Sequence, residues 1–461
     1  MSSLRPTPRR LAGAAAAAAV LLAAACKSDP VLVGTTTPTS GAAFMTRYVA
    51  LGNSITAGFQ SGGINDSTQR RSYARMLALA AGATYKYASL TNPGCPPPII
   101  NFVTGDRGSL GGVANTGTTC LLRDPTSITT VLNNVAVPGA NSFDPIGTGF
   151  TGAAGSVGGY SALTTFILGN RTQVDRAIQL NPTFATIWIG NNDVLSFAIG
   201  GTTTGVTALN TFVGNYATMV NTLRAGAPGL QGGVLIGVVD VTNTPLLIPI
   251  SVINPASTGT GVNAFQQSAF VGVRTLFGAT TPSVFTGPRP ATFTIGFDAS
   301  CNNTTAAISI PVLQQVAAGL SAAAPGFTFV CTPGATVPAA MLDATERQTF
   351  VDRVAAYNAY IRAKADSVGF AYVDPNALLT PLKASGAIPP FPDLRNPTAP
   401  FSAPGTAGTA NQLRYISNDG VHPSTTAHFV VANALITAIN TKYGSSIRAL
   451  VPADTAAGGG L

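Results

Sequence analysis

The chain has 461 residues, a formal net charge of +8 at pH 7 and only 9% charged residues. Its body contains no cluster of Lys and Arg, so it lacks the electrostatic footprint of a nucleic-acid-binding protein, and we expect no nucleic acid as a partner. The mean hydropathy of +0.31 is high. No stretch of about 18 apolar residues follows Cys26, however, which indicates a soluble globular body rather than a membrane-spanning one.

The first 25 residues have the pattern of a secretory signal peptide. Three arginines among the first ten residues precede an apolar stretch from Leu11 to Ala25, which is too short to span a bilayer. Removal of this peptide would lower the net charge from +8 to +5. Small residues lead directly into Cys26, in a pattern that resembles a bacterial lipobox with Ala23 in place of the preferred Leu. The resemblance implies lipidation of Cys26, and a plain signal peptide cut elsewhere is the alternative.

The residue after Cys26 is Lys27 rather than the Asp associated with inner-membrane retention. In a Gram-negative host, the resemblance to known lipoproteins therefore implies an outer-membrane lipoprotein that faces the periplasm or the cell surface. Residues 27–43 are rich in Thr, Pro, Gly and Ser without periodicity, which predicts a tether over residues 26–45. The expected contact with the membrane is the lipid anchor at Cys26.

From about residue 46, strand and helix patterns alternate, which is the signature of a parallel α/β sheet. Up to residue 241 the predicted strands are Tyr48–Leu51, Ala185–Ile189 and Gly233–Val241. One helix is predicted to begin after Ser72, and two more are predicted over Gln173–Leu180 and Val206–Arg224.

The C-terminal part continues this alternation. Asp343 and Glu346 have the spacing of a capping box, and Gly369 is the expected stop of the helix that they begin. A short strand over residues 370–374 and a last helix from Ser424 to Tyr443 follow. Residues 446–461 are predicted to form a flexible tail.

Two segments, residues 61–130 and 245–341, interrupt the alternation and are too long for ordinary connections. We interpret them as insertions. The second leaves the carboxyl end of a predicted strand, where the ligand crevice of an open parallel sheet lies, so it would roof the site.

Each insertion contains two cysteines, and four cysteines in an oxidising compartment predict two disulfides. Three connectivities are available, and we predict the local one, which joins Cys95 to Cys120 and Cys301 to Cys331. Zinc binding is disfavoured because the chain has no C-x-x-C spacing and only two histidines, so no metal is assigned.

The two histidines, His422 and His428, restrict any imidazole-dependent chemistry. Only His422 has a carboxylate three residues upstream, that of Asp419, to orient its ring. Ser54 stands where the first strand runs into a helix, so its hydroxyl is well placed to react. A serine nucleophile needs a base that is held in one tautomer, and these three residues therefore predict a catalytic triad. His428, in the final helix, is interpreted as structural.

A tetrahedral intermediate also needs hydrogen-bond donors aimed at its oxyanion. The strand before Gly190-Asn191-Asn192-Asp193 places the Asn192 amide at a carboxyl end, and residues 135–140 offer the N–H of Gly139 without a side chain in the way. With the N–H of Ser54, they predict an oxyanion hole. Plainer roles remain open for each residue alone: a helix cap for Ser54, a turn for His422 and Gly139, and a strand cap for Asn192.

In this order Ser54, Gly139, Asn192 and His422 resemble the four blocks of the SGNH, or GDSL-type, esterase and lipase family. The resemblance implies a flavodoxin-like three-layer α/β sandwich with a mostly parallel sheet over residues 46–445, here with disulfide-stapled insertions. It also implies the catalytic roles given above and no cofactor. Asn53 departs from the family, which usually has Asp there, but the triad carboxylate comes from Asp419, so the turn should survive. The Gly-x-Ser-x-Gly elbow of α/β-hydrolases does not occur.

The expected function is hydrolysis of a lipid or acyl ester by a monomeric enzyme through an acyl-serine intermediate. The second insertion carries only Arg274, Arg289 and Asp298 as charged residues, so it would form an apolar wall that sets the preference for acyl chains. The alternatives are an acetyl esterase that acts on polysaccharide and a non-catalytic surface lipoprotein that binds glycan or lipid.

Overall fold

The structure is a computed structural model. It describes residues 42–100, 107–108, 131–147, 163–169, 171–254, 294–302, 304–309, 326–332, 341–388 and 415–456. The predicted signal peptide, the lipidation site Cys26, most of the tether and Cys120 lie outside these residues. Within the described part of the chain, no helix is both long and apolar enough to cross a membrane.

A four-stranded parallel sheet forms the centre of the fold. Its strands are β1 (Tyr48–Gly52), β2 (Phe184–Trp188), β3 (Gly232–Ile236) and β8 (Ala371–Val373), in the spatial order β1-β2-β3-β8. All pairs are parallel, with Tyr48 opposite Phe184 and Phe184 opposite Gly232. The first three strands are buried along their whole length, which explains their nearly continuous apolar sequences, because helices cover both faces of a parallel sheet.

Residues 133–137 extend this sheet beyond β1. The N–H of Ala50 donates to the carbonyl of Asn133 (2.7 Å), and the N–H groups of Val135 and Val137 donate to the carbonyls of Ala50 (3.0 Å) and Gly52 (3.2 Å). This segment therefore runs parallel to β1 and completes the 2-1-3-4-5 strand order of a flavodoxin-like sheet.

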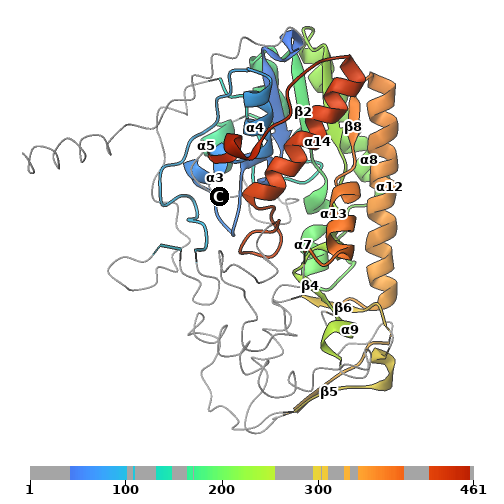
Figure 1. Cartoon of the computed structure of the whole chain (residues 1–461). Helices are drawn as coiled ribbons and strands as arrows, with labels where there is room; N and C mark the ends of the chain where they lie inside the picture. The colour runs from blue at the N-terminus through green and yellow to red at the C-terminus, as the bar shows by residue number, and fades with distance from the viewer. Residues whose placement is uncertain are drawn as a thin grey trace, which may run out of the picture. The chain divides into compact units, whose positions relative to one another are not determined.

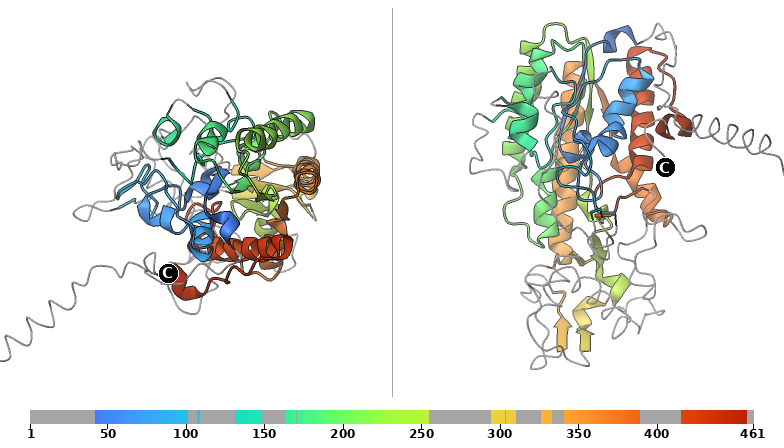
Figure 2. Two further views of the ribbon diagram at one scale, coloured as in Figure 1. Left: turned by 90° about the horizontal axis from the view of Figure 1, so that it is seen from above. Right: turned by 90° about the vertical axis from the view of Figure 1, so that its left-hand side faces the viewer.

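Helices form a layer on each side of the sheet. Alternate residues of β1 point to opposite faces, so that Val49 and Leu51 belong to one apolar core and Tyr48 and Ala50 to the other. The first core lies beneath α6 (Gln173–Gln179), α8 (Leu209–Gly226) and α12 (Ala344–Val368), and the second beneath α4 (Tyr73–Ala80) and α14 (Thr425–Tyr443). Figures 1 and 2 show the resulting three layers, which confirm the predicted fold class.

The remaining elements are shorter. They are η1 (Ala43–Met45), α2 (Ser54–Ala57), α3 (Asp66–Arg70), α5 (Leu163–Leu168), η3 (Asn191–Asp193), α7 (Leu195–Ile199), η4 (Val241–Asn243), β4 (Leu247–Pro249), α9 (Ile250–Ile253), β5 (Thr294–Phe297), η7 (Ala299–Cys301), β6 (Ala307–Ser309), β7 (Gly326–Phe329), α13 (Asn376–Ala384) and α15 (Pro452–Ala456).

The ends of the long helices follow their sequence signals. The side chain of Asp343 accepts from the N–H groups of Thr345 and Glu346, and the Glu346 side chain accepts from the Asp343 N–H, which confirms the capping box of α12. Gly369 ends α12 with a φ of 75°, a left-handed conformation that glycine adopts at little cost. Ser424 caps α14 through the N–H of Ala427.

Three boundaries differ from the sequence-based expectation. The helix predicted after Ser72 is α4, but α3 and α4 both lie in the segment interpreted as the first insertion, and α4 covers one face of the sheet. Ala42 and Met45, which fall within the predicted tether, are buried. Residues 446–456, predicted as part of a flexible tail, pack against α14 through the buried side chains of Ile447 and Leu450. Apolar residues a few positions past the helix are sufficient to hold this segment.

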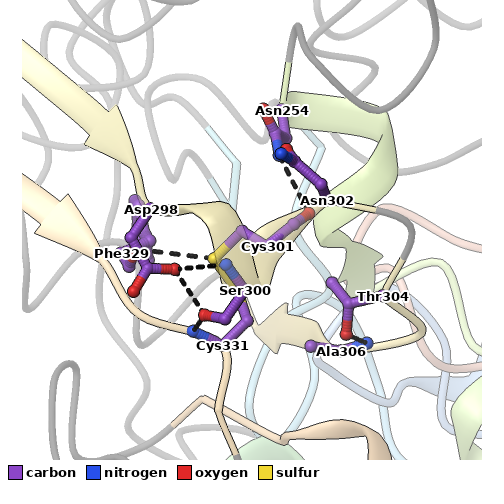
Figure 3. Close-up of a disulfide and its surroundings, with 9 residues drawn as sticks. All are labelled: Asn254, Asp298, Ser300, Cys301, Asn302, Thr304, Ala306, Phe329 and Cys331. Atoms are coloured by element: carbon purple, nitrogen blue, oxygen red, sulfur yellow. Dashed lines mark hydrogen bonds between the residues drawn. A yellow bond between two sulfur atoms is a disulfide. The ribbon is translucent and has the colours of Figure 1, made fainter.

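The second insertion contributes two small sheets. β4 pairs with β6 in antiparallel orientation, and β5 pairs with β7 in parallel orientation. The predicted disulfide between Cys301 and Cys331 is present, with its sulfur atoms 2.01 Å apart. Around it, the Cys331 N–H donates to Ser300 Oγ (2.8 Å) and Asn254 Nδ2 donates to the Cys301 carbonyl (2.9 Å), as Figure 3 shows.

The other disulfide is only partly described. Cys95 is buried and disulfide-bonded. Its predicted partner, Cys120, lies outside the described residues, so the pairing of Cys95 with Cys120 stays a prediction.

Candidate active site

The turn that carries Ser54 follows directly from the end of β1. Asn53 is extended and caps α2, because its side chain accepts a hydrogen bond from the Ile55 N–H (3.1 Å). Ser54 is the first residue of α2 and retains 8% of its surface. The amide here makes the cap that an Asp carboxylate would also make, so the turn tolerates the departure from the family's usual residue.

Gln173, at the start of α6, fixes the strand end before this turn. Its side chain is fully buried; its Oε1 accepts from the Gly52 N–H (3.0 Å), and its Nε2 donates to the Gly52 carbonyl (3.0 Å). A buried backbone unit left without such partners would be costly. Sequence reasoning placed Gln173 only at a helix start, and no local pattern reveals this long-range pairing.

The three predicted triad residues are hydrogen-bonded in series. Ser54 Oγ lies 2.9 Å from His422 Nε2, and His422 Nδ1 lies 2.7 Å from Asp419 Oδ2. Ser54 and the other two residues are more than 350 positions apart in the chain. The carboxylate fixes the tautomer in which Nδ1 carries the proton and Nε2 can accept one from the serine.

Asp419 is surrounded by donors. Its Oδ1 accepts from the N–H groups of His422 (2.8 Å) and Val421 (3.0 Å), and its Oδ2 accepts from the N–H of Gly62 (2.6 Å). Burial would raise the pKa of Asp419, but the interactions with His422 and with these N–H groups hold the pKa well below the usual range of an aspartate. Asp419 is therefore ionised at every pH at which the protein is expected to work.

Residues of the first insertion support this carboxylate. The guanidinium of Arg107 donates to the carbonyl of Gly62 (2.8 Å), the residue whose N–H reaches Asp419. Arg107 also interacts electrostatically with Asp419. The sequence analysis gave no role to Arg107 or Gly62, because neither lies near Asp419 in the chain.

The loop that holds His422 is a closed hairpin. Ile416 pairs with Pro423, and the Ser417 N–H donates to the His422 carbonyl (2.8 Å). Across the site, the Ser61 N–H donates to Ser417 Oγ (2.8 Å), and the ring of Phe59 lies 4.8 Å from the imidazole. The segment after Ser54 and the hairpin around His422 are thus held together by contacts that do not involve the reacting atoms.

Hydrogen bonds join the segments that carry Gly139 and Asn192 to each other and to the end of β1. Asn192 Nδ2 donates to the carbonyl of Ala140 (2.9 Å), and the Val137 N–H donates to the carbonyl of Gly52 (3.2 Å). These bonds tie the Gly139 segment both to η3 and to the strand end that leads into Ser54. Gly139 is exposed and has a φ of 89°. An amide nitrogen carries two N–H donors, so Asn192 keeps one beyond its bond to Ala140.

The turn into η3 requires glycine. Gly190 has a φ of 122°, and a Cβ at this position would lie 2.5 Å from Val238 Cγ2. The glycine of Gly-x-Asn-Asp is therefore a steric requirement for bringing Asn192 to the edge of the sheet.

The aspartate of the same motif anchors the Gly139 segment. Asp193 is buried and accepts hydrogen bonds from the N–H (2.8 Å) and the Oγ (2.7 Å) of Ser142. Burial raises the pKa of Asp193 to about 6, although these hydrogen bonds act in the opposite direction. Sequence reasoning quoted this residue but gave it no role, and its place directly after Asn192 was the available signal.

His428 lies away from this arrangement. It is fully buried in α14; its Nδ1 accepts from the Tyr73 N–H (3.2 Å), and its ring stacks on that of Tyr73 at 6.2 Å. Burial lowers the pKa of His428 to about 3, so the ring is neutral in the folded protein. Its partner is the first N–H of α4, which agrees with a structural role.

The arrangement of Ser54 and His422 is suited to proton transfer and nucleophilic attack. Across the described residues, no group of three or more His, Cys, Asp or Glu side chains is arranged to hold a metal ion. The serine, the oriented imidazole and the donors of the Gly139 and Asn192 segments lie at the carboxyl end of the sheet, where ligands bind in open α/β folds.

Comparison with protein families gives a match. The family model described as GDSL-like Lipase/Acylhydrolase matches residues 48–435, which include every residue of the site. No curated protein matches the chain.

Proposed function

The chain belongs to the GDSL-like lipase/acylhydrolase family of ester hydrolases, and we propose that it hydrolyses carboxylic esters through an acyl-serine intermediate on Ser54. His422 is the general base and Asp419 orients it. The observation that carries the proposal is the unbroken series of hydrogen bonds from Ser54 Oγ through His422 to Asp419, at 2.9 and 2.7 Å.

The reaction has two halves. In the first, His422 Nε2 takes the proton of Ser54 as Oγ attacks the ester carbonyl, and the resulting imidazolium then protonates the leaving alcohol as the C–O bond breaks. In the second half, His422 takes a proton from water, the hydroxide oxygen attacks the acyl carbon, and the proton returns to Ser54 as the carboxylic acid leaves. Each half begins and ends with the neutral imidazole.

The electrostatics of Asp419 support this cycle. Because its pKa is held below the usual range, the carboxylate stays ionised and stabilises the imidazolium that forms in each half. The donors from the N–H groups of Gly62, Val421 and His422 keep both oxygens in place while the charge on the ring changes. The carboxylate does not need to take up a proton.

We assign the oxyanion hole to the N–H of Ser54, the N–H of Gly139 and the Asn192 amide. The positive φ of Gly139 and its exposed backbone support its part, and the remaining N–H donor of Asn192 supports the other. Preorganised donors of this kind stabilise the tetrahedral intermediate by about 3–4 kcal/mol each.

We further propose that the substrate is a lipid or other acyl ester and that Cys26 anchors the enzyme to the outer membrane. Support for the substrate comes from the apolar character of the second insertion, and support for the anchor comes from the signal pattern that ends at Cys26. The Cys26→Ser variant should be absent from the membrane fraction of the cells that produce it, whereas the parent protein should be present there. Retention of that variant in the membrane would contradict the anchor.

The test of the reaction is loss of the nucleophile. Ser54→Ala should fold normally and hydrolyse p-nitrophenyl esters at least about 10³-fold more slowly than the parent protein. Ser367→Ala, an exposed serine on α12, is the matched control and should retain full activity. Turnover by Ser54→Ala at the parent rate would contradict the proposed function.

A further inference from the structure

We propose that the apolar pocket between α13 and α14 binds the acyl chain of the ester and limits its length. This inference rests on the proposed function, and it assigns a part of the molecule that neither the family nor the triad specifies. Both helices contribute side chains to the lining of the pocket, and Figure 1 shows α13 below α14.

Chain neighbours of the reacting residues line the pocket. Three of its lining residues are chain neighbours of the triad: Ile55 follows Ser54, and Val421 and Pro423 flank His422. A fourth, Val239, donates its N–H to the side chain of Asn191, which directly precedes Asn192 (2.9 Å). A chain attached to the acyl carbon on Ser54 therefore has this pocket within a few carbon atoms.

The lining suits a hydrocarbon. Apart from Thr244, Tyr415 and the indole of Trp188, its side chains are those of Ala, Val, Leu, Ile and Pro. The three leucines that α13 contributes, Leu378, Leu379 and Leu382, are each only partly buried. An apolar helix face that no other side chain covers completely gains stability when an acyl chain removes it from water.

The volume points to a short or medium chain. The pocket measures about 90 Å³, well below the roughly 300–1,000 Å³ of sites that enclose drug-sized ligands. We therefore expect kcat/KM to rise from acetate to about hexanoate and to fall again before palmitate.

The described lining of this pocket differs from the sequence-based expectation, which placed the apolar wall in the second insertion. None of the described lining residues belongs to residues 245–341. The insertion does touch the site, because the Leu246 N–H donates to the carbonyl of Gly420 in the His422 hairpin (3.2 Å). Its described role is thus to support the hairpin, whereas α13 and α14 supply the wall.

The first experiment fills the pocket. Ala427 of α14 lines it, and Ala427→Phe should lower the kcat/KM ratio of hexanoate to acetate. Each excluded methylene is worth about fourfold, so three would lower the ratio by roughly 60-fold. Ala377→Phe introduces the same side chain at an exposed position of α13 and is the matched control, with an unchanged ratio.

A second variant enlarges the pocket, so that the test does not depend on how Ala427→Phe folds. Leu382→Ala removes three carbon atoms from the wall and should move the preferred chain length upward by about two to four carbons. Overlapping chain-length profiles of Leu382→Ala and the parent protein would overturn the proposal.

The chain's single tryptophan provides a readout independent of turnover. Trp188 is 2% exposed and lines the pocket, so a bound chain should change its fluorescence. Titration of the Ser54→Ala protein with methyl hexanoate should give a saturable change that methyl acetate does not give. The same change after Ala427→Phe is added would place the chain elsewhere and refute the assignment.

The experiments distinguish failure of the proposed function from failure of the pocket assignment. If Ser54→Ala keeps the parent turnover, the proposed function fails. If Ser54→Ala is inactive but the pocket variants leave both the chain-length profile and the Trp188 signal unchanged, only the pocket assignment fails.

Discussion

The hairpin that carries His422 and the first turns of α14 that carry His428 place the same side chain in opposite environments. The His422 side chain retains 16% of its surface and has a hydrogen-bonding side chain at each ring nitrogen, Asp419 at Nδ1 and Ser54 at Nε2. His428 is fully buried and its Nδ1 accepts a hydrogen bond from the Tyr73 N–H, whereas its Nε2 has no partner among the described residues.

The difference shows which surroundings allow an imidazole to act as a general base. Burial lowers the pKa of His428 to about 3, His422 acts in the same direction, and no carboxylate of the described residues offsets the cost of charging the ring. At His422, an ionised carboxylate is hydrogen-bonded to the opposite nitrogen, so the imidazolium formed during the reaction is stabilised. His422 and His428 are close in the sequence, but their hydrogen-bonding partners decide which of them can act as a base.

Substituting each histidine separately should give the largest difference in activity. His422→Ala removes the base and should lower kcat/KM for p-nitrophenyl hexanoate by about 10⁴- to 10⁶-fold. His428→Asn keeps an acceptor near the Tyr73 N–H and should leave kcat/KM within about threefold of the parent. A variant of His428 that abolished activity while staying folded would reverse the assignment.

The second test changes the partner rather than the histidine. Asp419→Asn retains the shape of the side chain but favours the wrong tautomer of His422, so kcat should fall by about 10⁴-fold. Asp352→Asn, on the exposed face of α12, is the matched control and should behave as the parent protein. Steady-state kinetics of both variants would settle the point, and equal kcat values would contradict the role of Asp419.

A smaller effect is expected at Gln173, which holds the strand end below Ser54. Gln173→Leu leaves the N–H and carbonyl of Gly52 without their side-chain partners and should lower the free energy of unfolding by about 1–3 kcal/mol. The shifted serine should lower kcat by about tenfold to 10²-fold, with all triad residues intact. Urea unfolding and kinetics on the same preparation test both numbers.

The smallest effect on activity, but a distinct effect on stability, concerns the pH response of His428. Its pKa is about 3 when folded and about 6.5 when unfolded, so the unfolded state binds more protons between these values. The free energy of unfolding therefore decreases as pH falls from about 6.5 toward 3. His428→Asn removes this dependence.

Comparing the parent protein with His428→Asn isolates the contribution of His428 to the pH dependence of stability. The raised pKa of Asp193, about 6, gives a dependence of opposite sign, since the folded state then binds the extra proton, but it is present in both proteins. Urea midpoints at pH 7.5 and pH 4.5 should show the parent losing more stability than His428→Asn over this range. Parallel losses would show that His428 does not titrate as a buried neutral ring.

Much of the fold could be predicted because its signals are local. The capping box of Asp343 and Glu346 and the stop at Gly369 lie within one helix, and each strand of the four-stranded sheet begins within a residue of its expected start. The end of β3 could not be predicted from its pattern. The apolar run continues to Val239, but the Asn358 side chain replaces the ladder at Val238, accepting from its N–H (2.6 Å) and donating to its carbonyl (2.9 Å).

The candidate site shows the same division. Asp419 and His422 are three residues apart, and Ser54 and Asn192 each follow a strand, so their types and spacing were sufficient to select them. Gln173 and Arg107 act on residues far away in the chain, and nothing in their own neighbourhood indicates a partner. The pocket between α13 and α14 likewise depends on how two helices meet, which neither helix pattern specifies.

The most direct test of the central account is covalent labelling with a serine-directed fluorophosphonate. The parent protein should incorporate one phosphonyl group, and peptide mass mapping should place it on Ser54. His428→Asn should react at the parent rate, whereas His422→Ala should react at least about 10³-fold more slowly because no base activates the serine. Labelling at another serine, or equal rates in the two histidine variants, would contradict the account.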